Sequence, residues 1–276
     1  IKAMRVSRIS LRGSIVLTAV PDEEIGGHLG SGYLVRSGLV SGDACIIGEP
    51  SGVDTVDVAQ KGALWLELVT LGRSAHGSMP HLGINAVEKM AFIITALGEL
   101  RKKYEERKSR ILFPEAARHV TINIGGVIQG GSKINVVPDR CSCTLDVRVI
   151  PELTTADVEG DIRRLLEDLS AKDPELRYEI RVIDRIEPAY TSEEEPIVKT
   201  VSRAVQDVLG VEPKYGGLTG FTDMRWFKEI MPTVIYGPGD ISQAHTPNES
   251  VPIEELVVAS KVYALTAMRY LGYLSS

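Results

Sequence analysis

Cysteine, aromatic residues and long apolar runs are scarce in this sequence of 276 residues, of which 5% are aromatic. Its three cysteines cannot all pair with one another, and no C-x-x-C spacing occurs, so we expect buried thiols rather than a disulfide framework or zinc ligands. A reducing, cytoplasmic compartment suits such thiols. No apolar run approaches the roughly 20 residues of a membrane span, and the first residues lack the apolar core of a signal peptide. We therefore expect no membrane partner.

Positive charge is in deficit. The 37 Asp and Glu residues outnumber the 31 Lys and Arg residues, which gives a formal net charge of −6. Phosphate binding needs clustered Lys and Arg, so this balance argues against a nucleic-acid partner. The densest basic stretch, residues 101–110, contains two glutamates and follows a helical pattern, and we interpret it as the solvated end of a helix.

The first part of the chain, residues 1–58, has the pattern of an α/β domain. Residues 14–20, SIVLTAV, form a near-continuous apolar run that predicts a parallel strand buried on both faces. A short, glycine-interrupted helix is expected over residues 26–39, and a second buried strand over residues 43–49. Strand, helix and strand in this order form a βαβ unit.

The last part, residues 187–276, resumes this style. Pro196 is placed to open a helix and Gly210 to end it. A buried strand, PTVIYG, and a final helix over residues 253–270 follow. The simplest architecture is one α/β domain, residues 1–58 with 187–276, into which a smaller domain is inserted.

The middle part, residues 59–186, has a different rhythm. Its first strand alternates between apolar and mixed positions, and a helix from Asn85 to Tyr104 carries apolar residues at helical spacing. Two strands, a second helix and a closing strand follow. The order β-α-β-β-α-β predicts an α+β ferredoxin-like sandwich.

Metal-capable side chains follow three of the expected buried strands. Glu23 and Glu24 come after residues 14–20, Glu49 after the second strand, and His245 after PTVIYG. Ligands of open α/β sheets bind beyond the carboxyl ends of the strands, so we expect these side chains to meet at one edge. Each taken alone has a plainer interpretation, as an acidic helix start, a capped turn or a loop histidine.

Carboxylate and imidazole ligands suit zinc, and the bias toward carboxylates also suits manganese or cobalt. Two adjacent glutamates permit one to bind the metal while the other acts as general base.

Five motifs span nearly the whole chain in order: TAVPDEEIGG, DACIIGEPSG, KGALWLELVTLGRSAHGSMPHLGINAVEKM, GGSKINVVPDRCSCTLDVR and AHTPNESV. Together they resemble those of the di-zinc amidohydrolase and metallopeptidase family that includes acetylornithine deacetylase, succinyl-diaminopimelate desuccinylase, glutamate carboxypeptidase and aminoacylase. The resemblance implies a zinc-peptidase-like α/β catalytic domain. It also implies that the inserted domain is a lid through which two copies dimerise.

The resemblance also assigns residue roles. Glu23 resembles the general base, and Glu24, Glu49 and His245 resemble ligands of two zinc ions. His76 resembles the lid histidine that polarises the scissile carbonyl in the partner subunit.

The remaining roles concern the substrate. Asn135 and Arg148 resemble lid residues that hold its carboxylate, and the planar fork of Arg148 matches a carboxylate bidentately. The loop GGLTGFTDMRWF, with Gly220 and Thr222, resembles the substrate loop. Asp223 in this loop is a weaker candidate for the site, because it could simply cap the following helix.

The resemblance also implies two further metal ligands, one from an upstream H-x-D motif and one from a later Asp. Neither has a counterpart here, and none of the five histidines of this sequence lies in an H-x-D motif. We therefore expect the chain to be an N-terminally truncated core fragment of a longer enzyme and to be inactive alone. The longer enzyme is expected to hydrolyse the amide of a small N-acyl amino acid with a free carboxylate. A metallo-carboxypeptidase or dipeptidase of the same family, or a non-catalytic dimeric binding module, are the alternatives.

Overall fold

The computed structural model describes residues 1–111 and 113–274, and the chain divides into two compact units. Unit 1 comprises Ile1–Gln60 with Ala189–Ser276, and unit 2 comprises Lys61–Pro188. The boundaries expected from the sequence lie two residues away at each junction. The assignment of catalysis to one part, and of lid and dimerisation to the other, stays a prediction.

Unit 1 is built on a mixed sheet with the order β2-β10-β3-β8, to which β9 adds by pairing with β3. The pair β2 and β10 is parallel, as is the pair β3 and β9, whereas β3 runs antiparallel to β10 and to β8. The elements of this unit are α1 (Lys2–Val6), β1 (Ser10–Leu11), α2 (Ser31–Arg36), β2 (Cys45–Ile47), β3 (Thr55–Gln60), β8 (Ala189–Tyr190), α5 (Pro196–Leu209), β9 (Lys214–Leu218), α6 (Met224–Phe227), β10 (Thr233–Ile235), α7 (Ile253–Leu271) and β11 (Tyr273–Leu274).

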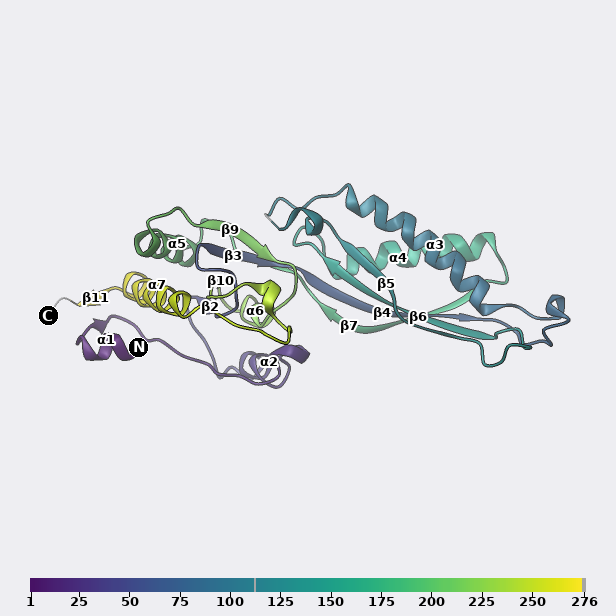
Figure 1. Cartoon of the computed structure of the whole chain (residues 1–276), viewed down its shortest axis with the longest axis horizontal. Helices are drawn as coiled ribbons and strands as arrows, with labels where there is room; N and C mark the ends of the chain where they lie inside the picture. Colours follow the sequence, from purple (N-terminus) through teal and green to yellow (C-terminus); the bar gives the residue numbers. More distant parts are fainter. Residues whose placement is uncertain (112, 275–276) are drawn as a thin grey trace. The chain divides into compact units, whose positions relative to one another are not determined.

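Helices cover both faces of this sheet because its central strands are apolar on both sides. Val234 of β10 packs in the cluster with α5 and α7, while the next residue, Ile235, packs in the cluster with α6. Successive side chains of a strand point to opposite faces, so one strand supplies both clusters. Figure 1 shows α5 and α7 beside the strands of unit 1.

The strand expected over residues 14–20 is absent. These residues have no regular structure, and the side chains of Val16 and Leu17 are 65% and 80% exposed. An apolar run becomes a buried strand only where a neighbouring strand accepts its hydrogen bonds. Within the described residues no strand pairs with this run.

Unit 2 has the expected order of elements, β4-α3-β5-β6-α4-β7. Its antiparallel sheet has the spatial order β5-β6-β4-β7, which is that of a ferredoxin-like sandwich. Both helices lie on one face of the sheet (Figure 1) and share its core. The bounds are β4 (Gly62–Leu71), α3 (Ala86–Glu105), β5 (Thr121–Gly130), β6 (Arg140–Val149), α4 (Thr155–Lys172) and β7 (Arg177–Ile186).

Local chemistry explains where the helices begin and end. The Asn85 side chain accepts hydrogen bonds from the backbone N–H groups of Val87 and Glu88, which opens α3. Pro196 occupies the first turn of α5, and Gly210 ends that helix with a left-handed φ of 73°. These three boundary predictions are confirmed.

Cys141 and Cys143 are buried on one face of β6, and all three cysteines are free thiols. None of the helices in residues 1–111 and 113–274 has the length and apolar character of a membrane span.

Candidate metal and catalytic site

The two adjacent glutamates lie in a single 3-10 turn, Glu23–Ile25, of unit 1. Asp22 precedes the turn with a left-handed φ of 65°, which is uncommon for a residue with a side chain. Its carboxylate does not cap the turn but accepts a hydrogen bond of 2.7 Å from the backbone N–H of Leu29. The acidic run is therefore a tight, internally braced turn rather than a capped helix start.

Glu49 follows β2, whose parallel neighbour β10 ends beside it. The two strands pair from Cys45 opposite Thr233 to Ile47 opposite Ile235, so their carboxyl ends coincide. Just beyond them, a Cβ atom placed on Gly237 would lie 2.6 Å from the Glu49 carbonyl oxygen. A glycine is required at position 237 because the two backbone segments that follow β2 and β10 approach each other closely.

The carboxylates in this region crowd one another electrostatically. Burial raises the pKa of Glu23 to about 7, and the nearby charges of Glu49, Asp223 and Glu24 add to the shift. Burial, then Asp223 and Glu24, raise the pKa of Glu49 as well. Like charges that approach in a partly buried place favour either protonation or a bound cation.

His245 reaches the same turn. Its Nε2 atom lies 3.5 Å from Oε2 of Glu24, and both side chains are exposed. His245 has a left-handed φ of 62°, and its backbone N–H donates to Glu249 at 2.9 Å. Among the described residues, no three His, Cys, Asp or Glu side chains are grouped so that they could hold a metal ion. The structure thus brings Glu24 and His245 together without completing a ligand set.

Asp223 is a member of the carboxylate cluster, since its charge acts on Glu23 and Glu49, whereas the sequence offered it only as a weaker candidate of the substrate loop. Its side chain makes no capping hydrogen bond to α6. Instead its Oδ2 accepts a hydrogen bond of 2.6 Å from the hydroxyl of Ser31, which lies 192 residues away in the sequence. Burial raises the pKa of Asp223, and the Ser31 hydrogen bond opposes that shift.

Thr222 is buried and already engaged. Its backbone N–H and its hydroxyl both donate to Oε1 of Gln60, at 2.9 and 2.8 Å, and the hydroxyl accepts from Met224 N. Gly220 lies two residues earlier, partly exposed. These bonds fix the loop on β3, while contact of Gly220 or Thr222 with a substrate stays a prediction.

In unit 2, His76 and Asn135 lie on neighbouring loops. Gly77 N donates to the Asn135 carbonyl at 2.8 Å, and His76 pairs with Val136 in an isolated bridge. The Ser78 backbone N–H donates to Nδ1 of His76 at 3.2 Å, which assigns the proton of the neutral ring to Nε2. His76 can therefore offer an exposed N–H.

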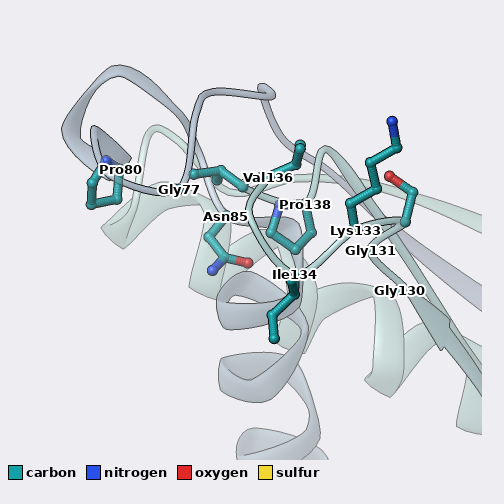
Figure 2. Close-up of a pocket in the computed structure, with 11 residues that line it drawn as sticks. Gly77, Pro80, Asn85, Gly130, Gly131, Lys133, Ile134, Val136 and Pro138 are labelled. Carbon is teal, nitrogen blue, oxygen red and sulfur yellow. The ribbon is translucent and has the colours of Figure 1, made fainter.

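A pocket of about 580 Å³ opens between these two loops. Gly77, Pro80 and Asn85 line one side, and residues 130–134 and 136–138 line the other. Figure 2 shows Asn85 at the start of its helix, facing the loop that carries Lys133 and Ile134.

Arg148 does not present an open fork. Its Nε and Nη2 atoms bind the two oxygens of Asp146 at 2.8 and 3.0 Å. Lys61 lies near enough to be affected: burial and then the charge of Arg148 lower the pKa of Lys61 to about 8. A carboxylate ligand of Arg148 would have to compete with Asp146.

The chain matches Peptidase family M20/M25/M40 over residues 1–269. An acetylornithine deacetylase from Erwinia tasmaniensis is 31% identical over 242 residues, which is 88% of this chain and 60% of that protein. The acetylornithine deacetylase of Photorhabdus laumondii is 30% identical, over 93% of this chain and 63% of that protein. The chain thus spans about three fifths of the length of these curated relatives.

Solved structures agree in fold. An aminopeptidase from Bacillus cereus superposes with a TM-score of 0.77 at 20% identity, covering 96% of this chain and 66% of that one. A metallo-carboxypeptidase from Sulfolobus solfataricus gives 0.68 at 24% identity, covering 90% and 68%. At these identities the likeness shows the α/β fold and not the activity.

Proposed function

Because the chain belongs to Peptidase family M20/M25/M40, we propose that it is the core of a metal-dependent amidohydrolase that removes the acyl group from a small N-acyl amino acid. The names of the curated relatives, acetylornithine deacetylases, support the deacetylase type. A desuccinylase acting on a diaminopimelate-like amine is the neighbouring choice within the same chemistry.

One observation carries this proposal: burial raises the pKa values of Glu23 and Glu49, and the neighbouring carboxylates of Asp223 and Glu24 raise both further. Like charges gathered in a partly buried place are costly unless a cation or a proton offsets them.

The donor chemistry fits zinc, with cobalt or manganese as substitutes. Glu24, Glu49 and His245 would hold the metal, since carboxylate oxygen and imidazole nitrogen are its usual ligands. When bound, the metal supplies Lewis-acid polarisation of the scissile carbonyl and acidifies water. Each ion needs about three protein ligands, so three residues do not serve two ions. We propose that the remaining ligands come from a segment preceding this chain in a longer protein.

Glu23 is the general base of this proposal. Its carboxylate removes the proton from the attacking water and returns it to the leaving amine, so that the proton balance closes within one turnover. Glu24, its neighbour in the turn, is turned toward His245, which leaves Glu23 free for proton transfer. This division explains why two glutamates stand side by side.

Three residues of unit 2 complete the proposal. The Nε2–H of His76 donates to the developing oxyanion in the site of the partner subunit, as a preorganised hydrogen-bond donor does. Asn135 and Arg148 hold the substrate carboxylate, with Arg148 exchanging Asp146 for the ligand. We further propose that unit 2 mediates homodimerisation, and that the protein is cytoplasmic.

The proposal is tested on the polypeptide encoded by the full reading frame, with free amine measured after incubation with N-acetylornithine, N-succinyl-diaminopimelate and dipeptides. Glu23→Gln is expected to lower kcat by about 10²–10⁴ with KM little changed, because it removes proton transfer and keeps the shape. Glu193→Gln is the matched control, an exposed glutamate of unit 1.

Three outcomes would count against the proposal. Hydrolysis of dipeptides without hydrolysis of acyl amino acids selects the peptidase alternative. An active Glu23→Gln variant removes Glu23 from the mechanism. No hydrolysis of any of these substrates, with normal folding, selects the non-catalytic binding module.

A further inference from the structure

The turn that carries Glu23 and Glu24 is tied to α6 through a tryptophan. Nε1 of Trp226 donates a hydrogen bond of 3.1 Å to the backbone carbonyl of Gly26, the residue that ends this turn. Trp226 lies 200 residues from Gly26 in the sequence, so this contact is purely tertiary. The bond reaches the turn at the first residue after Glu23–Ile25.

Three cationic or aromatic groups fix the plane of this indole. The guanidinium of Arg225 lies 4.5 Å from the ring centroid, and that of Arg36 lies 4.9 Å away. The ring of His28 meets the indole edge-on, with centroids 5.2 Å apart and an interplanar angle of 72°. Arg36 also donates to the His28 carbonyl at 2.7 Å. Cation–π and edge-to-face contacts of this kind restrict the ring more than apolar packing alone.

Glycines let the indole lie directly against the backbone. A Cβ atom on Gly27 would be 3.0 Å from Nε1 of Trp226, and one on Gly32 would be 2.8 Å from Cε2. Side chains at either position would push the ring away from the Gly26 carbonyl.

Apolar packing does not anchor the turn in its place. Ile25, the apolar residue of the turn, is 80% exposed, and Leu29, which follows it in the sequence, is 77% exposed. A turn of three residues that buries no apolar side chain needs polar tethers to hold one direction. The indole N–H is such a tether, and it joins the glutamate turn to α6.

We propose that Trp226 is a positioning residue for Glu23 and Glu24. Its N–H fixes the Gly26 carbonyl and through it the direction of the two carboxylates, without touching metal or substrate. The inference rests on the proposed function for its catalytic consequence and on the geometry above for its structural one. Hydrolysis therefore depends on the hydrogen bond between Trp226 and the Gly26 carbonyl, although neither group takes part in the reaction.

The test compares Trp226→Phe, which keeps an aromatic ring and removes the N–H, with the wild type. Hydrogen exchange followed by mass spectrometry reports the backbone of residues 20–32. We expect about fivefold faster exchange there, the factor that corresponds to one lost hydrogen bond, with unchanged exchange in α5. In the hydrolysis assay we expect kcat to fall about tenfold and KM to stay constant.

Phe92→Leu is the control, because Phe92 is an exposed aromatic residue of α3 in unit 2. It should change neither measurement. Unchanged exchange of residues 20–32 in Trp226→Phe overturns the inference whatever the activity. Faster exchange with unchanged kcat also overturns it and leaves the proposed function standing. If the wild type hydrolyses none of the substrates, the proposed function is wrong. The exchange data then still decide whether Trp226 holds the turn.

Discussion

The hydroxyl of Ser31 donates a hydrogen bond of 2.6 Å to Oδ2 of Asp223, and both residues are buried. Ser31 is the first residue of α2, shortly after the glutamate turn, and Asp223 directly precedes α6. The bond therefore joins the two segments that surround the carboxylate cluster. A buried carboxylate without its donor would carry the full cost of its desolvation.

Replacing Ser31 by Ala is expected to destabilise unit 1 by about 1–3 kcal/mol, because Asp223 keeps its burial and loses its donor. Unfolding in urea measures the change. Ser202→Ala is the matched control: Ser202 is also buried, but its hydroxyl has no hydrogen-bond partner in the described part of the chain. It should leave the free energy of unfolding unchanged or raise it. Equal losses in the two variants would contradict the role of the Asp223 bond.

Gly27 should tolerate no side chain. It has a φ of +66°, and a Cβ there would lie 2.4 Å from Oδ1 of Asp223. Gly27→Ala is therefore expected to cost about 2–4 kcal/mol, from backbone strain and overpacking together. Gly38 has nearly the same φ, +62°, but a Cβ there would meet no heavy atom within 4 Å. Gly38→Ala should cost about 1 kcal/mol, from strain alone. Similar losses at both glycines, measured by urea unfolding, would refute the close approach of Asp223.

Asp57 makes the stability of unit 1 depend on pH. Burial in β3 raises the pKa of its carboxyl from 3.8 to about 7. Below about pH 4 both states are protonated. Between about pH 4 and 7 the unfolded chain releases this proton while the native state keeps it, so the free energy of unfolding falls as pH rises. The loss attributable to Asp57 is at most about 4 kcal/mol.

Asp57→Asn cannot ionise and should lack this contribution. Urea unfolding at pH 5 and pH 7.5 is expected to show a smaller loss of stability for the variant than for the wild type. Glu23 and Glu49 titrate in the same direction but are present in both proteins, so the difference isolates Asp57. Parallel pH profiles would contradict the assignment.

Much of the fold follows from local chemistry. The cap at Asn85, the bounds of α5 at Pro196 and Gly210, and the order of elements in unit 2 are all readable, because their causes lie within a few residues. The expected strand over residues 14–20 failed for the opposite reason. Its apolar pattern is real, but a strand also requires a partner, and the described sheet of unit 1 supplies none. Strand β9, KYGGL, was not predicted, because its two glycines lack the side chains whose alternation indicates a strand.

The residues of the site likewise include some that the sequence predicts and some that it does not. Glu24 and His245 were expected to meet, and the structure places them 3.5 Å apart. Asp223 was interpreted as a possible helix cap, whereas its partner is Ser31, on a distant segment. No local signal identifies such a pair. Trp226 was likewise invisible as a tether, since its acceptor is a backbone carbonyl and backbone groups leave no mark in the sequence.

Metal content per chain tests the central claim most directly. We would measure zinc, cobalt and manganese by mass spectrometry in the polypeptide of the full reading frame, in its Glu49→Gln and His245→Ala variants, and in the 276-residue chain alone. The account predicts about two ions per chain in the full polypeptide, a clear loss in each variant, and almost none in the isolated chain. A full polypeptide that binds no metal, or that keeps all of it in both variants, would contradict the account.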